Sequence, residues 1–166
     1  MSWLWEKLRA VSSAEMAGLQ LEFRGCWAIT MSQWDPELGF AALPILAGNN
    51  SILYLEGGAH SEEVASFIAT HLVPAVEKIA RGTILPQEKT YHLPATAAVF
   101  DGLSRLADHH ALPEICSHLV VYRPALVVVD WYDVFDREAY VSSTIPENIV
   151  CEFAQAVGGS YRIETD

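Results

Sequence analysis

The segment Asp130–Glu138 is the part of the chain richest in side chains that could recognise another molecule. Its sequence is Asp-Trp-Tyr-Asp-Val-Phe-Asp-Arg-Glu, and it follows a valine-rich run. Tryptophan and tyrosine are enriched in interaction hot spots, and carboxylates around them select a basic partner. Because side chains alternate between the two faces of a strand, aromatic and acidic groups fall on both faces here. The segment predicts a partner-binding surface made of Asp130, Trp131, Tyr132, Asp133, Phe135 and Asp136.

Two other interpretations of this segment stay open. It can be an ordinary strand end, with aromatic rings packed under a neighbouring helix and solvated acids. It can also be a carboxylate site for a hard cation, although aspartates three residues apart do not build a known calcium loop.

Acidic charge favours the partner surface, because residues 130–166 hold eight acids against two arginines.

A second group of chemically capable residues is Asp108-His109-His110, followed by Cys116 and His118. Histidine, cysteine and carboxylate are the usual zinc ligands. The spacing matches no standard zinc finger, and adjacent histidines on a helix point about 100° apart. Histidine is also favoured at a helix C-terminus by the helix dipole. We therefore favour an ordinary helix C-terminus and assign no metal ligand, with a zinc site as the alternative.

The pair Gly57-Gly58 precedes a helix that starts near Ser61 and could form a backbone nest for an anion, beside His60. Glutamates in the first turn of that helix would repel the anion. An ordinary strand-to-helix turn is the favoured interpretation, and His60 as a general base is the alternative.

Common catalytic and cofactor motifs are absent from the sequence. The chain has no Walker loop, no dinucleotide-binding glycine pattern, no nucleophile elbow, no paired Cys-x-x-Cys and no zinc-protease or EF-hand motif. We expect no cofactor and assign no catalytic residue, although a site assembled from distant residues is compatible with this absence.

Hydrophobic periodicity predicts the elements that position these residues. We expect helices over 2–11, from 61 to 82 with an interruption at Pro74, over 95–110 and from 144 to 157, the last with a capping box at Thr144 and Glu147. We expect strands over 19–23, 26–31, 52–55, 118–122, 126–132, 139–143 and 160–163, turns at 34–39 and 48–51, and a connection over 86–94. Strands grouped in this way predict a single α+β domain over 1–166, with an antiparallel or mixed sheet and helices on one face.

Composition narrows the class of protein. The 166 residues carry a formal charge of −11, are 51% hydrophobic and include 3 cysteines. The apolar fraction excludes a disordered acidic tail, and the cysteine count excludes a disulfide scaffold. Net acidity opposes nucleic-acid binding, and no apolar run is long enough for a signal peptide or membrane helix. Free thiols suit a cytoplasmic protein.

We therefore expect a small acidic cytoplasmic binding module that recognises a basic protein partner. By analogy of size and charge, an immunity-type or antitoxin-type inhibitor fits this description. The alternative is a small enzyme or ligand-binding domain whose pocket combines carboxylates with His60, His92, His109 or His118. A third hypothesis is a homodimer formed through the tryptophan-rich N-terminus or an open sheet edge.

Overall fold

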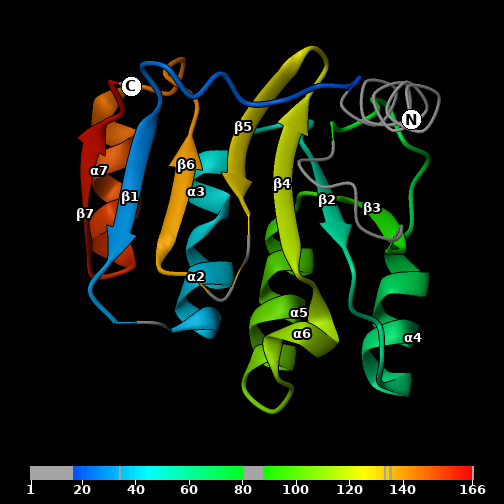
Figure 1. Cartoon of the computed structure of the whole chain (residues 1–166). Helices are drawn as coiled ribbons and strands as arrows, with labels where there is room; N and C mark the ends of the chain where they lie inside the picture. The colour runs from blue at the N-terminus through cyan, green and yellow to red at the C-terminus, as the bar shows by residue number, and fades with distance from the viewer. Residues whose placement is uncertain (1–16, 34, 81–87, 133, 135, 166) are drawn as a thin grey trace, which may run out of the picture.

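Seven strands form one antiparallel sheet in the computed structural model, which describes residues 17–33, 35–80, 88–132, 134 and 136–165. The strands lie in the order β3-β2-β4-β5-β6-β1-β7 (Figure 1). Their bounds are β1 Trp27–Met31, β2 Ile52–Glu56, β3 Thr90–Pro94, β4 His118–Arg123, β5 Leu126–Trp131, β6 Glu138–Val141 and β7 Gly159–Ile163. The pairings β2–β4, β6–β1 and β1–β7 join segments that are not consecutive along the chain.

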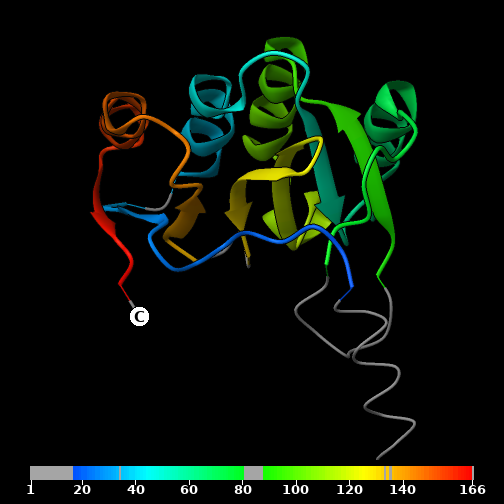
Figure 2. The ribbon, with the colours of Figure 1, turned by 90° about the horizontal axis from the view of Figure 1, so that it is seen from above.

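The longer helices cover one face of this sheet (Figure 2). These are α2 Pro36–Ala42, α4 Glu62–His71, α5 Ala97–Ala107 and α7 Glu147–Ala156. Two helices of four residues, α3 Pro44–Ala47 and α6 Leu112–Ile115, follow α2 and α5. The expected α+β class, with an antiparallel sheet and helices on one face, is confirmed.

Apolar side chains are buried on both faces of the central strand β4. Leu119 and Val121 belong to the main core between the sheet and the helices. Val120 and Tyr122 belong to a smaller cluster on the other face, which also holds Leu21, Cys26, Tyr54, Ile79 and Val127. The chain before β1 crosses this second face (Figure 2) and supplies part of that cover. The second face therefore has an apolar centre, while polar side chains lie toward its edges.

Several predicted elements were wrong in detail. The strand expected over 19–23 is instead a single bridge between Leu19 and Ile79, because this segment lies across the sheet and does not join it. The turn expected at 34–39 is helix α2, since the Asp35 side chain accepts a hydrogen bond from the Leu38 amide and Pro36 stands in the first turn. The connection expected over 86–94 contains strand β3, whose edge position tolerates Pro94.

The helix boundaries also differ from expectation. Helix α4 begins after the Ser61 cap as predicted, but it ends at His71, before Pro74. Thr144 does not cap α7, because the Thr144 amide donates to Ser142 Oγ and the helix starts after Pro146. The helix predicted over 2–11 lies outside the described residues, so a single domain over 1–166 stays a prediction. Among the described helices, none has the length and apolar character needed to cross a bilayer.

The turn between β2 and α4 depends on a glycine, which gives a test of the fold. Gly58 has φ +72°, and a Cβ there would lie 1.9 Å from the Ile115 carbonyl oxygen. Gly25 also has a positive φ, +81°, but open space around its Cβ position. Gly25→Ala should lower the free energy of unfolding by about 1 kcal/mol through backbone strain, and Gly58→Ala by about 1–3 kcal/mol more. Chemical denaturation measures both losses, and equal losses would contradict the close approach of the two segments.

Candidate functional site

His118 lies between two carboxylates that arrive from the neighbouring strands of the second sheet face. Its Nε2 lies 2.7 Å from Asp130 Oδ1, and its Nδ1 lies 3.7 Å from Glu56 Oε2. Strand register explains the grouping, because Glu56 pairs with His118 across β2–β4 while Asp130 pairs with Val120 across β4–β5. His118 is 7% exposed. Together with buried Glu56 and partly buried Asp130 it forms an ionic triad, which we call the sheet-face triad.

The charge state of His118 follows from its two acidic neighbours. Burial by itself would lower the pKa of His118, but hydrogen bonding to Asp130 and the nearby Glu56 carboxylate raise the pKa to about 9. His118 is therefore a cation at neutral pH. Since both ring nitrogens face carboxylates, the ring is held in place and is not available as a general base.

Tyr132 lies at the outer end of a row of aromatic contacts built on the triad. Its ring meets the His118 ring edge-on, with centroids 5.0 Å apart and planes at 68°. On the other side of His118, the Tyr54 ring makes a similar contact at 6.1 Å, and its hydroxyl donates a 2.9 Å hydrogen bond to Glu56 Oε2. Tyr132 is 51% exposed. The triad thus orients an aromatic ring that solvent can reach.

His92 continues this row toward the sheet edge but has different chemistry. Its Nδ1 lies 2.9 Å from the Tyr122 hydroxyl, which also accepts a hydrogen bond from the Val76 amide. His92 and Val76 therefore both contact the Tyr122 hydroxyl. Burial lowers the pKa of His92, which keeps the ring neutral. Tyr54 and His92 help to line a groove of about 400 Å³.

Only some residues of the predicted partner surface are exposed in the structure. Trp131 is wrong as a partner contact, because its side chain is 1% exposed, lies over Gly39 of α2 and donates to the Asp136 carbonyl. Asp130 was expected to pair with a partner's cation and is paired with His118 instead. Tyr132 and Asp136 are both exposed. Asp133 and Phe135 lie outside the described residues.

The histidine group expected from the sequence is divided between two places. Cys116 is buried in the main core, and burial raises the pKa of its thiol to about 12, so the thiol stays protonated. His118 belongs to the sheet-face triad, while His109 and His110 lie in the loop after α5. The group does not meet at one site, because β4 carries His118 back into the sheet.

The proposed anion nest and the His60 base receive little support from the geometry. The Gly57 amide already donates to the Lys89 carbonyl at 2.9 Å, so one of the two nest donors is occupied. His60 is exposed, and its ring has no hydrogen bond or ion pair to another described residue. The ordinary strand-to-helix turn accounts for both glycines.

Glu56 and Tyr54 are the site residues that sequence reasoning missed. Their signal was present, since residues two apart in a strand share a face and 52–56 carries Tyr54 and Glu56 among apolar neighbours. A glutamate at the end of a buried strand needs a compensating charge. The sequence does not show the strand register that places His118 opposite Glu56.

The raised pKa of His118 predicts how stability depends on pH. The folded state holds the imidazole proton more tightly than the unfolded state, whose histidine pKa is near 6.5. This contribution to stability is full below about pH 6.5 and is lost as the pH rises to about 9. Over that range the free energy of unfolding should fall by roughly 1–3 kcal/mol more in the wild type than in His118→Gln.

Chemical denaturation of both proteins from pH 6 to pH 9.5 measures this difference. The matched control is His60→Gln, which removes an exposed histidine and should keep the wild-type pH dependence. Identical pH profiles for wild type and His118→Gln would show that the triad does not hold a charged imidazole.

The exposed Tyr132 ring and the triad beneath it are the geometric basis for a functional assignment. Neither a family model nor a curated protein nor a solved structure matches this chain.

Proposed function

We propose that this chain is a small acidic binding module that recognises a basic protein partner through the surface around Tyr132 and Asp136. The observation that carries the proposal is the half-exposed Tyr132 ring, held edge-on by His118 of the sheet-face triad. An inhibitor of a basic enzyme is the kind of protein that combines such a surface with small size and strong acidity.

Orientation of Tyr132 before binding favours a role in recognition. Tyrosine offers a large amphipathic contact with few rotatable bonds, so little conformational entropy is lost when it binds. Its ring is already placed by His118, and His118 is held by two carboxylates. A Lys or Arg of a partner can stack on the open side of the ring as a cation–π contact.

Charge favours a basic partner over a neutral one. The sheet-face triad holds two carboxylates and one imidazolium, so it has a net negative charge at neutral pH. Asp136 is exposed nearby in sequence, and its Oδ1 accepts only a local hydrogen bond from the Arg137 amide among the described contacts. The whole chain has a formal charge of −11, which speeds encounter with a cationic surface.

The proposal predicts the binding behaviour of two variants. Immobilised wild-type chain, incubated with extract of its source cells at low salt, should retain a basic protein. Tyr132→Ala should weaken that complex about tenfold or more, equivalent to about 1.4 kcal/mol. Asp136→Lys should slow association and reduce its dependence on salt.

A matched control is Glu152→Lys, which makes the same charge change at an exposed position of α7. This variant should retain the partner as the wild type does. The complex should then be rebuilt from the two purified proteins and its affinity measured by titration calorimetry. Equal retention by wild type, Tyr132→Ala and Asp136→Lys, or no retained protein at low salt, would contradict the proposal.

A further inference from the structure

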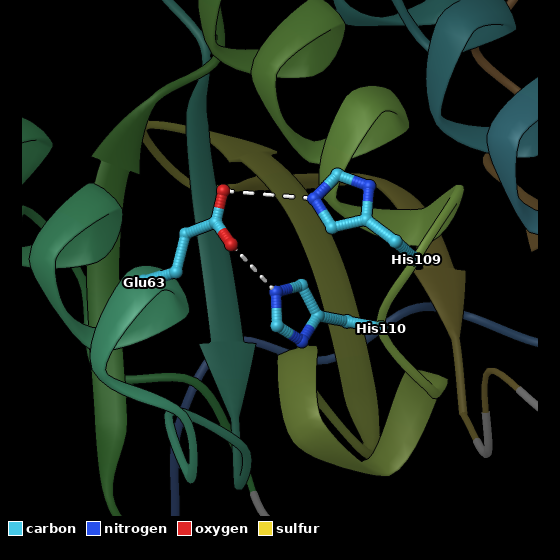
Figure 3. Close-up of side chains that lie close together, drawn as sticks. All are labelled: Glu63, His109 and His110. Atoms are coloured by element: carbon cyan, nitrogen blue, oxygen red, sulfur yellow. Dashed lines mark hydrogen bonds and ion pairs between the residues drawn. The ribbon is translucent and has the colours of Figure 1, made fainter.

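We infer that Glu63, His109 and His110 form a binding site for a transition-metal dication of the zinc class. This inference shares no residue with the proposed partner surface and departs from the favoured interpretation of His109 and His110 as an ordinary helix C-terminus. Figure 3 shows both imidazole rings turned toward the two oxygens of one carboxylate. His110 Nε2 lies 3.0 Å from Glu63 Oε2, and His109 Nε2 lies 3.6 Å from Glu63 Oε1.

Local backbone structure brings the two histidines to the same side. Helix α5 ends at Ala107, and the amides of His109 and His110 both donate to the Leu106 carbonyl, at 3.2 and 2.8 Å. The chain is therefore in a turn, and the two rings lie with centroids 5.0 Å apart. Adjacent histidines on a regular helix point about 100° apart, whereas in this turn both rings face Glu63. Glu63 in the first turn of α4 faces both rings.

Spacing of the three donor atoms suits a tetrahedral ion. Ligand atoms about 2.0–2.1 Å from a tetrahedral zinc ion lie roughly 3.3 Å from one another. The nitrogen–oxygen separations of 3.0 and 3.6 Å reach the two different oxygens of Glu63, and one ligand atom from each of the three residues lies within 4.8 Å of the others. Small side-chain movements would complete the geometry. Two histidines and one glutamate are also a ligand set that zinc uses in enzymes.

A carboxylate beside its other ring nitrogen holds His110 in the orientation that ligation needs. His110 Nδ1 lies 3.2 Å from Glu114 Oε2, and this oxygen also accepts a hydrogen bond from the Ala111 amide at the start of α6. His109 Nδ1 lies 4.0 Å from Asp108 Oδ2. Ligating histidines characteristically give their other ring nitrogen to a carboxylate, which fixes the ring and strengthens it as a ligand. Glu114 stands where such a group is required, whereas Asp108 lies beyond hydrogen-bond distance of His109.

The charges around the three side chains are consistent with a site for a cation. Hydrogen bonds from His110 and His109 lower the pKa of Glu63, and the hydrogen bond to Glu63 raises the pKa of His110. Arg105 lines the adjoining groove of about 350 Å³, together with Phe67 and Leu106, and is the cation that opposes metal binding. The carboxylates of Glu63, Glu114 and Asp108 outnumber it.

Exposure leaves coordination positions open. Glu63 and His109 are exposed, while His110 is partly buried. Three protein ligands at a groove mouth leave a fourth position for water or a small ligand, as in open zinc sites.

Titration calorimetry with zinc chloride on the untagged full chain tests this inference. The wild type should bind one equivalent of Zn²⁺ at pH 7.5. Glu63→Gln, His109→Ala and His110→Ala should each weaken binding about tenfold or more. Affinity should fall between pH 7.5 and pH 5.5, because the imidazoles must lose a proton to bind the ion.

Matched controls separate this site from other zinc-binding groups. Glu62→Gln changes the adjacent glutamate of the same helical turn, and His71→Ala removes a histidine at the other end of α4. Both should bind Zn²⁺ as the wild type does, and circular dichroism should show all variants folded. Absence of Zn²⁺ binding to the wild type, or binding that none of the three ligand variants weakens, would overturn the inference.

Discussion

Burial of the central strand β4 on both faces is the constraint on which the rest of this structure depends. One face of β4 packs against the helices, and the other needs a second layer of side chains from strands and crossing segments. A charged group at the start of such a strand cannot be left alone, because an unpaired buried charge costs several kcal/mol. His118 is charged because carboxylates from both neighbouring strands hold its proton, and the same contacts pair that charge.

The second sheet face therefore combines an apolar centre with paired polar side chains. A second group of paired charges lies toward β7, where Arg162 is 2.9 Å from Glu138 and 3.2 Å from Glu164. These pairings mean that much of the acidic charge on this face is already compensated within the chain. What distinguishes the Tyr132 region is an exposed aromatic ring beside such a pairing.

Histidines illustrate how position decides chemistry in this chain. Burial without a carboxylate lowers the pKa of His92, whereas two carboxylates raise that of His118. His110 is held by Glu63 and Glu114 at the ends of helices, where solvent and ions can reach the group. The same residue type thus serves the packing of a sheet face in one place and provides an open ligand cluster in the other.

Elements with strong local signals were predictable. The valine-rich runs gave the β4–β5 hairpin, because alternation and a short loop specify a hairpin without any other segment. Helices α5 and α7 followed from their apolar stripes. Predictions were wrong for segments whose structure depends on a distant neighbour. Residues 19–23 alternate as a strand does, but they form only one isolated bridge, between Leu19 and Ile79.

The sequence by itself determined the α+β class, the acidity and most of the strands and helices, because these depend on composition and local periodicity. Tertiary structure alone decided which polar groups meet. Strand register placed Glu56 and Asp130 on either side of His118, and the packing of α2 buried Trp131. The end of α5 and the start of α4 brought Glu63 to His109 and His110. Such encounters join residues far apart in the chain, and local periodicity contains no information about register or packing between distant segments.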